Sequence, residues 1–487
     1  MARALLLCAC VAAAATATTV TVTVSPATTF GEWQGWGVSL AWWANVWGAE
    51  PGLADAVFSL ATVSVQNNSL LGLGLQRARY NAGASSNHTT TDGSSMVVSP
   101  NMPAWKQIGA FWVDWLPAPA GTWDWTADAN QVAMLRAAAA RGADAEIFSN
   151  SPVWWMCSNH NPSGSESGSD DNLQPWNHAQ HAAYVATVAA HARDAWGVTF
   201  STIELFNEPI ANWWKASGTQ EGCHFDAATQ AAVLAELPGA LAAANLTGVR
   251  VAASDESRID MALSTWGALP AAARSVIDVV NVHGYQEGGD RAGLYRAVVQ
   301  QGGKELRDSE YGDGDGTGGE MVASILADLA ALHPRAWAYW QVVDVSAGWA
   351  LLRGDAASGA LGPVNAKWYA LAQFSRHIRA GMAVLATADS AAAPAAAAAL
   401  DAAAGLLVLV LSNAEVGAAD FDVDLSAFAA VPAGAAAAWA TSTAGAAPTP
   451  GAAHTALAGV AVGADRHVRL SLPPWTVVTI EVSGVRA

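Results

Sequence analysis

The sequence predicts an α/β protein, a (β/α)8 TIM barrel with an attached all-β sandwich that the C-terminal region forms together with an N-terminal strand. Three observations lead to this fold class. Short apolar runs alternate with Ala-rich segments of helical length between residues 35 and 343, which is typical of βαβ units and a parallel sheet. After about residue 375 the pattern changes to short alternating runs between Ala/Gly/Pro-rich turns. A chain of 487 residues, 52% of them hydrophobic, can build one large core and a smaller one.

Eight apolar runs are the expected barrel strands, because each is short and ends in polar residues before the next helical segment. The runs span residues 35–43, 73–81, 146–156, 202–209, 249–257, 279–285, 304–312 and 336–343. The expected helices between them include residues 127–141, 177–195, 226–243 and 319–332. Eight such units favour a closed barrel over a doubly wound sheet. No GxGxxG motif follows the first run, so nothing indicates a nucleotide-binding fold.

Four alternating runs near the C-terminus are the expected strands of the sandwich. They span residues 405–412, 421–425, 467–472 and 476–482. Residues 18–24 (TTVTVTV) alternate strictly outside the barrel pattern, so we expect them to add a strand to the same sandwich. The Ala tract at 391–404 has low complexity and is expected to be a loop. We therefore place the N-terminal strand at 18–30, the catalytic barrel at 31–372 and the sandwich at 373–487.

The composition excludes one class of partner and favours another. The chain carries 23 Lys+Arg against 41 Asp+Glu, for a formal net charge of -18, and has no basic cluster, so nucleic acid is not an expected partner. It also has 23 Trp residues, several of them in pairs such as Trp42-Trp43 and Trp213-Trp214. Indole rings offer flat apolar faces with one N–H, which suit stacking on sugars, although they also fill large cores. The Trp content therefore favours a sugar-binding protein.

The N-terminal segment has the features of a secretory signal peptide. A basic start precedes an apolar stretch at residues 4–15 and small residues follow, so we expect residues 1–17 to be removed. The stretch is too short to span a membrane, and no later stretch of about 18 apolar residues is uninterrupted. We expect a secreted protein that acts as a monomer. Three N-glycosylation sequons agree with secretion, at Asn67, Asn87 and Asn245.

Neither cysteine nor metal chemistry is indicated by a motif. Cys157 and Cys223 remain after the leader, each in a polar loop, and could form a disulfide in an oxidising compartment, a pairing that the sequence leaves open. The stretch 313–318 (DGDGTG) resembles the start of a calcium loop. Its twelfth position is Ser324 rather than Glu, so we expect a flexible loop and no metal site.

Two carboxyl groups end barrel strands on opposite sides of the expected mouth. Active groups in this fold lie at the C-terminal ends of the strands. Glu208 ends the fourth run and Glu310 ends the seventh. Such a pair suits glycoside hydrolysis, in which one group protonates the leaving oxygen and the other attacks the anomeric carbon or activates water. Either Glu taken alone could be a solvated loop residue, so the argument rests on the pair.

We expect the two carboxyl groups to have different surroundings. Trp213 and Trp214 give Glu208 an apolar setting, and such a setting raises a carboxyl pKa and suits the acid. Arg79, at the end of the second run, is the candidate cation that keeps Glu310 ionised. An acid that stays protonated beside an ionised nucleophile predicts a bell-shaped profile with an acidic optimum.

Two neighbouring polar groups are expected to assist. The amide of Asn207 can donate to a sugar hydroxyl next to the reacting carbon. Asp255 and Glu256 form another acidic pair at a strand end, and we expect them to orient the site by hydrogen bonds rather than to react.

Several segments of the chain resemble glycoside hydrolase family 30. In chain order they are GWGVSLAWWANVWG, FSNSPVWWM, ELFNEP, QEGCHF, SEYGDGDG and YWQ. More narrowly, they resemble its endo-β-1,6-galactanase-like branch. The resemblance covers almost the whole chain after the leader, including a terminal sandwich to which both chain ends contribute. It implies net retention through a covalent glycosyl-enzyme, with Glu208 as the acid/base, Glu310 as the nucleophile and no cofactor.

The resemblance also implies residues of the sugar pocket and a substrate. The implied pocket residues are Arg79, Asn81, Asn207, His283, Tyr285 and Trp340, with Trp43, Asn150 and Trp155 as further pocket or subsite residues. The implied substrate is the β-1,6-galactan side chains of arabinogalactan-type polysaccharide. Relatives in the family use β-1,6-glucan or glucosylceramide, so these substrates stay open. A catalytically silent sugar-binding protein is a further alternative, against which the presence of both carboxyl groups counts.

Overall fold

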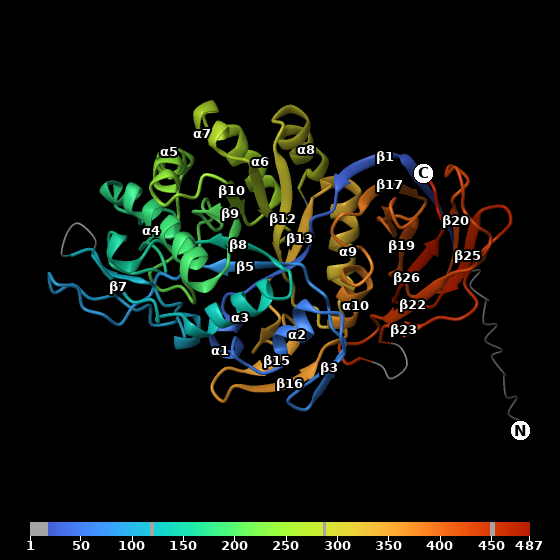
Figure 1. Cartoon of the computed structure of the whole chain (residues 1–487), viewed down its shortest axis with the longest axis horizontal. Coiled ribbons are helices and arrows are strands. Elements are labelled where there is room, and N and C mark those ends of the chain that lie inside the picture. Colours follow the sequence, from blue (N-terminus) through green and yellow to red (C-terminus); the bar gives the residue numbers. More distant parts are fainter. Residues whose placement is uncertain (1–17, 117–120, 286–288, 449–452) are drawn as a thin grey trace, which may run out of the picture.

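The centre of the molecule is a closed barrel of eight parallel strands (Figure 1). The computed structural model describes residues 18–116, 121–285, 289–448 and 453–487. The barrel strands are Gly35–Ser39 (β2), Arg77–Asn81 (β5), Asp144–Phe148 (β8), Phe200–Glu204 (β9), Arg250–Glu256 (β10), Val279–His283 (β11), Glu305–Tyr311 (β12) and Ala336–Tyr339 (β13). Each overlaps one of the eight expected runs, and β13 pairs with β2 to close the barrel. The barrel prediction is therefore confirmed.

Helices surround the barrel strands. They are Trp43–Trp47 (α1), Leu53–Phe58 (α2), Ala129–Ala139 (α3), His178–His191 (α4), Ala227–Ala243 (α5), Ile259–Ala268 (α6), Ala271–Val276 (α7), Arg291–Tyr295 (α8), Gly319–Ala327 (α9) and Ala366–Ser375 (α10). The four expected helices correspond to α3, α4, α5 and α9. Helix α5 begins after Asp226, whose side chain accepts the N–H of Thr229 at 2.7 Å, a typical N-cap.

The alternation of side chains along the barrel strands separates a polar interior from an apolar outer layer. On β5, Ala78 and Tyr80 belong to the hydrophobic core between strands and helices. Arg77 and Arg79 alternate with them, and both lie 3.7 Å from carboxylate oxygens of Glu146 on β8. Successive strand residues face opposite sides, so these charged side chains lie inside the barrel. The polar interior leads upward to the carboxyl ends of the strands.

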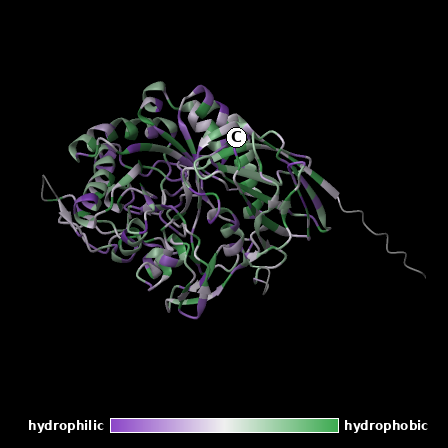
Figure 2. Ribbon diagram, turned by 45° about the vertical axis from the view of Figure 1, so that its right-hand side comes forward, coloured by the Kyte–Doolittle hydropathy of each residue, from purple (hydrophilic) through white to green (hydrophobic). Residues whose placement is uncertain are grey.

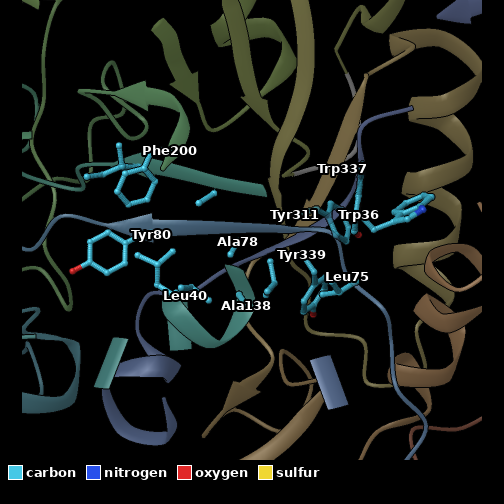
Figure 3. Packing of buried hydrophobic residues seen from close by; sticks show 14 of the residues in the cluster. Trp36, Leu40, Leu75, Ala78, Tyr80, Ala138, Phe200, Tyr311, Trp337 and Tyr339 are labelled. Atoms are coloured by element: carbon cyan, nitrogen blue, oxygen red, sulfur yellow. The ribbon is translucent and has the colours of Figure 1, made fainter. Parts of the chain in front are cut away.

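Aromatic residues fill much of the layer outside the barrel strands. Figure 3 shows Trp36 near Trp337 on one side of the view and Tyr80 near Phe200 on the other. The ring centroids of each pair are 6.0 Å apart. At this separation aromatic pairs contribute stabilising contacts beyond their buried area. Part of the unusual Trp content therefore belongs to the core.

Strands from both ends of the chain form one continuous 11-stranded sheet. They are Thr18–Glu32 (β1), Ala383–Asp389 (β17), Ala396–Asp401 (β18), Leu406–Asn413 (β19), Ala419–Asp424 (β20), Gly434–Ala435 (β21), Ala437–Ser442 (β22), Thr455–Ala456 (β23), Ala461–Val462 (β24), His467–Leu472 (β25) and Thr476–Ser483 (β26). Strand β1, blue in Figure 1, pairs in parallel with β20 and antiparallel with β17. The N-terminal segment thus joins the C-terminal strands as expected, and the sandwich takes the form of a single sheet around its own core.

Strand β19 is buried on both faces. Leu407, Leu409 and Leu411 belong to the core of the sheet, whereas Val408 and Val410 belong to the core of the barrel. A strand covered on both faces is a continuous apolar run in sequence, which explains GLLVLVLS at residues 405–412. Figure 2 shows hydrophobic residues along the strands of this sheet.

The neighbouring Ala tract also lies between the two cores. Ala396 and Ala398 face the core of the sheet, and Ala397 and Ala399 face that of the barrel. The prediction that residues 391–404 are a loop was wrong, because six of them form β18 between β17 and β19. Low complexity hid the strand, since alanine on both faces shows no alternation of polarity.

The structure describes only some of the features that a secreted protein is expected to have. The predicted signal peptide at residues 1–17 lies outside the described residues. Within the described part of the chain, no helix is long and apolar enough to cross a bilayer. The three sequon asparagines, Asn67, Asn87 and Asn245, are exposed.

The two cysteines in the described part of the chain are not bonded to each other. Cys157 and Cys223 are buried free thiols, so the disulfide that the sequence left open is not formed in the structure. Burial raises the pKa of Cys157 to about 12, which makes it an unreactive thiol.

Candidate active site

The carboxyl ends of the barrel strands open into a cleft of about 840 Å³. Both expected carboxyl residues, Glu208 and Glu310, line it. Its aromatic lining includes six Trp residues, which are Trp42, Trp105, Trp213, Trp214, Trp340 and Trp349. Flat indole faces around paired carboxyl groups suit a sugar chain that lies across the site.

Glu310 lies at the end of β12 and receives hydrogen bonds from two sides. Arg79 on β5 donates to its Oε2 at 2.6 Å, and the hydroxyl of Tyr285 donates to its Oε1 at 2.8 Å. The side chain is only 4% exposed, and Arg79 is also buried. The structure thus places the expected cation directly against Glu310, with a phenol on the other carboxylate oxygen.

Glu208 lies in the loop after β9, in a backbone conformation that few residues other than glycine adopt, with φ of 50°. Its N–H donates to the carbonyl of Asp255 at 2.8 Å, and its own carbonyl accepts the indole N–H of Trp214 at 2.8 Å. The ring of Trp214 needs a glycine beside it, because a Cβ on Gly222 would lie 1.9 Å from Cε3. The surroundings therefore hold the loop in an uncommon conformation.

The side chain of Glu208 also meets N–H groups on both oxygens. The indole N–H of Trp213 donates to Oε2 at 3.2 Å, and Nδ1 of His283 lies 3.1 Å from Oε1. The two tryptophans counted as apolar neighbours from the sequence thus both act as hydrogen-bond donors to Glu208. The expected apolar rings therefore do surround Glu208, but they also supply polar N–H groups, because sequence does not show which edge of an indole ring faces the carboxyl group.

The two carboxyl groups lie close together across the mouth of the barrel. Glu208 and Glu310 each place an oxygen within 4.8 Å of the other and of a ring nitrogen of His283. His283 Nδ1 lies 3.1 Å from Glu208 and 3.5 Å from Glu310. Retaining glycosidases hold their carboxyl groups about 5–5.5 Å apart, whereas inverting enzymes leave about 6.5–9.5 Å for a water molecule. The separation here matches the retaining arrangement.

His283 is fully buried between three carboxyl groups. Burial lowers the pKa of His283, but the charges of Glu310 and Asp255 more than reverse this and hold the pKa well above its ordinary value. The ring is therefore an imidazolium near neutral pH, with Nε2 at 3.2 Å from Asp255 Oδ1. Although the three ligand atoms could surround a metal ion, a doubly protonated ring has no free lone pair for it.

Asp255 contacts both cations of the site, Arg79 and His283. It is fully buried, forms an ion pair with Arg79, and accepts the hydroxyl of Ser309 at 2.6 Å. Although burial opposes this, the charges of Arg79 and His283 hold the pKa of Asp255 below its ordinary value. Its neighbour Glu256 accepts the hydroxyl of Thr265 at 2.7 Å. Both carboxyl groups therefore make hydrogen bonds to neighbouring side chains, and their role in orienting the site stays a prediction.

Burial also changes the pKa of the Glu310 carboxyl group. Loss of solvent raises the pKa of Glu310, and although His283 and Arg79 lower it, the direction remains upward. Burial raises the pKa of Tyr285 well above its ordinary value, so the phenol keeps its proton and donates a hydrogen bond to Glu310. Ionised Glu310 thus depends on the two cations that touch it.

A buried lysine holds the loop that follows Glu310. The Nζ atom of Lys367, on α10, donates to the Asp313 carbonyl at 3.1 Å, the Tyr339 hydroxyl at 3.0 Å and the Gly348 carbonyl at 3.0 Å, and it pairs with the Asp313 carboxylate. The stretch that resembles a calcium loop thus places its first acidic side chain against an ammonium group. Lys367 also holds the loop that carries Trp349 into the cleft.

The remaining predicted residues separate into two groups. Asn207, Tyr285 and Trp340 line the cleft, and Asn207 accepts a hydrogen bond from Arg79 at 3.1 Å. Asn81 and Asn150 are fully buried below it, where Asn81 Oδ1 accepts the N–H of Asn150 at 3.1 Å. These two asparagines therefore support the floor of the site.

Two predicted subsite tryptophans lie elsewhere. Trp43 is fully buried in α1 and donates to the Ser39 carbonyl at 2.7 Å, whereas its neighbour Trp42 lines the cleft. Trp155 donates to the Trp112 carbonyl at 2.9 Å and packs edge-on against that ring. Trp43 and Trp155 thus belong to the aromatic packing behind the site.

Sequence reasoning missed several residues that line the cleft. Trp42, Trp105 and Trp349 are among them, as is Lys106, whose Nζ lies 3.7 Å from the centre of the Trp42 ring. The doublet Trp42-Trp43 could have pointed to Trp42 as a cleft residue. Trp105 and Lys106 lie in a three-residue 3-10 helix and Trp349 lies in a turn, and such short segments have no periodicity that tells which side chains face inward.

Comparisons with known proteins agree with this geometry. The model of the family described as "O-Glycosyl hydrolase family 30" matches residues 18–277. An endo-beta-1,6-galactanase from Hypocrea rufa is 48% identical over 367 residues, which cover 75% of this chain and 76% of that protein. A conserved exported protein from Bacteroides fragilis is similar in structure with a TM-score of 0.73 at 18% identity, over 95% of this chain and 100% of that one. The catalytic domain of GH30 xylanase C from Talaromyces cellulolyticus gives a TM-score of 0.70 at 18% identity, with the same coverage.

Proposed function

The chain belongs to O-glycosyl hydrolase family 30, and on that premise we propose that it is a retaining endo-β-1,6-galactanase in which Glu310 is the nucleophile and Glu208 the acid/base. The observation that carries the retaining mechanism is the separation of the two carboxyl groups, within 4.8 Å at their nearest oxygens. A carbohydrate with β-linked sugars is the substrate.

The proposed reaction has two half-reactions. Glu310 attacks the anomeric carbon, the bond from that carbon to the leaving oxygen breaks, and the leaving oxygen takes the proton of Glu208. A water molecule then attacks the same carbon from the side of Glu208. Glu208, now ionised, takes a proton from that water as the bond to Glu310 breaks. Two inversions at one carbon give net retention.

The groups around the pair have separate tasks in this mechanism. Arg79 and Tyr285 donate to opposite oxygens of Glu310, so they stabilise its charge before attack and after release. The imidazolium of His283 lies between both carboxyl groups and keeps them from repelling each other. Asn207 is held by Arg79 and lines the cleft beside the reacting centre, where its amide can donate to a sugar hydroxyl.

The proposed substrate is the β-1,6-galactan side chain of arabinogalactan-type polysaccharide. It is supported by the relative that carries the name endo-beta-1,6-galactanase at 48% identity. Cleavage within the chain is supported by the cleft, which spreads six indole rings around the carboxyl pair. β-1,6-Glucan and glucosylceramide are the alternatives that the same chemistry admits.

A direct test uses purified protein without residues 1–17. We expect it to cleave β-1,6-galacto-oligosaccharides and to leave β-1,6-gluco-oligosaccharides intact, and we expect NMR of the anomeric proton to show the β-anomer first. Cleavage of the glucan alone would keep the mechanism and change the substrate. Initial release of the α-anomer would contradict the role of Glu310. Absence of cleavage of either series would contradict the proposed activity.

We also propose that the protein is secreted and glycosylated. The N-terminal 1–17 stretch and the exposed positions of Asn67, Asn87 and Asn245 support this. Expression in a eukaryotic secretory host should release into the medium a protein that lacks the leader and loses mass on deglycosylation.

A further inference from the structure

Trp213 makes a contact that a simple stacking platform would not need. Its ring lines the cleft and is 40% exposed, so one part of it can meet a sugar. Its N–H does not point to solvent but donates to Oε2 of Glu208 at 3.2 Å. Trp213 lies five positions after Glu208, and the loop between them bends back on itself, because Ala211 donates its N–H to the Glu208 carbonyl at 3.1 Å.

The neighbouring residue fixes the same loop from the other side. Trp214 donates its indole N–H to the backbone carbonyl of Glu208 at 2.8 Å. Glu208 therefore accepts two indole hydrogen bonds from adjacent residues. Its backbone carbonyl accepts from Trp214, and its carboxyl group accepts from Trp213. The rings of the pair meet edge-on with centroids 6.2 Å apart, so the orientation of one constrains the other.

We propose that Trp213 is a positioning residue for Glu208, which orients Oε2 and favours the ionised carboxylate that acts as base in the second half-reaction. The inference rests on the proposed function, since it assigns a task to the partner of a catalytic acid/base. Glu208 has to be protonated in the first half-reaction and ionised in the second. An N–H donor binds a carboxylate more strongly than a carboxylic acid, so it favours the second state.

The two donors on Glu208 differ in charge and therefore in consequence. His283 is an imidazolium shared between Glu208, Glu310 and Asp255, so removing it would disturb all three. Trp213 is neutral, and Glu208 is the acceptor of its N–H. Removing the N–H of Trp213 therefore takes one hydrogen bond from Glu208 and leaves the cation contacts of Glu310 in place.

The test separates the N–H of Trp213 from its ring. Trp213→Phe keeps an aromatic face for the sugar but removes the donor. Without the donor the carboxylate that acts as base loses one hydrogen bond, so we expect the alkaline limb of the kcat/KM profile to move upward, with the acid limb unchanged. We also expect kcat to fall several-fold. The profile is measured on whichever oligosaccharide the unaltered protein cleaves.

Two controls keep the result decisive. Trp105→Phe changes another tryptophan of the cleft and should leave both limbs in place. In a Glu208→Gln background, with an aryl glycoside that needs no acid, Trp213→Phe should slow turnover no further, because its effect passes through Glu208. If the pH profile of kcat/KM for Trp213→Phe coincided with that of the unaltered protein, the inference would be overturned. It would also be overturned if Trp213→Phe slowed turnover further in the Glu208→Gln background. An inactive unaltered protein would instead contradict the proposed function.

Discussion

The two carboxyl groups of the cleft are held by different parts of the molecule. Glu310 ends a barrel strand and is fixed by charges that arrive from other strands, above all from Arg79 on β5. Glu208 lies in a loop with a left-handed backbone, and its donors include neutral indoles five and six residues further along. Both carboxyl groups share the imidazolium of His283, but only Glu310 also contacts a guanidinium, and only Glu208 also accepts an indole N–H from its own loop. The nucleophile is therefore held mainly by charges from barrel strands, whereas the acid/base is held in part by neutral donors from its own loop.

Of the variants that would test this difference between the two carboxyl groups, Glu310→Gln should lose the most activity. An amide cannot form the glycosyl-enzyme, so we expect turnover to fall by about four orders of magnitude or more on every substrate. Steady-state kinetics on an oligosaccharide and on an activated aryl glycoside should show the same loss. Thermal melting checks that the variant is folded. Near-normal turnover of either substrate would contradict the assignment of the nucleophile.

Glu208→Gln should have a smaller effect that depends on the substrate. On an oligosaccharide we expect a loss of about 10²–10⁴, because a poor leaving group needs a proton. An aryl glycoside with a good leaving group needs no acid, so its first half-reaction should be nearly unaffected and a burst of phenol should precede slow release of sugar. Equal losses on both substrates would show that Glu208 is not the acid.

Arg79→Met would test whether charge from the barrel sets the nucleophile. Arg79 lowers the pKa of Glu310, whose net direction is already upward. Its loss should raise that pKa further, so ionised Glu310 should require higher pH. We therefore expect the acid limb of kcat/KM to move upward and the alkaline limb to stay. An unchanged acid limb would contradict the electrostatic role of Arg79.

The same variant has an expected effect on stability. Asp255 and Glu310 would lose a buried partner, and breaking such a pair costs about 3–5 kcal/mol. In the unaltered protein the pKa of Asp255 is lowered, so its contribution to stability is present above the unfolded pKa and declines as pH falls through the folded one. Denaturant unfolding near neutral pH should therefore show a lower midpoint for Arg79→Met.

Local sequence patterns were enough to predict the barrel and its two carboxyl groups. Strand length, helical segments and the polar residues that end each strand are local properties, so all eight strands and the positions of Glu208 and Glu310 could be placed in advance. The contact between Arg79 and Glu310 could also be foreseen, since both residues belong to strands of one barrel.

Other features depend on contacts that no local pattern records. Trp42 and Trp43 are equivalent in sequence, yet one lines the cleft and the other donates to Ser39 in the core, because the first turn of α1 points only one of them inward. The strand Ala396–Asp401 was expected to be a loop, since alanine has no polarity to alternate. Its place depends on two hydrophobic cores that meet on its two faces.

The sequence by itself determined the barrel, the participation of both chain ends in one sheet, and the pair of carboxyl groups at strand ends. Each of these follows from periodicity and from the rule that parallel strands end at the same edge. Only the tertiary structure decided that His283 is an imidazolium between three carboxyl groups and that Trp213 turns its N–H toward Glu208. Charge and hydrogen-bond direction depend on which groups surround a side chain after folding, and those groups come from strands and loops far apart in the chain.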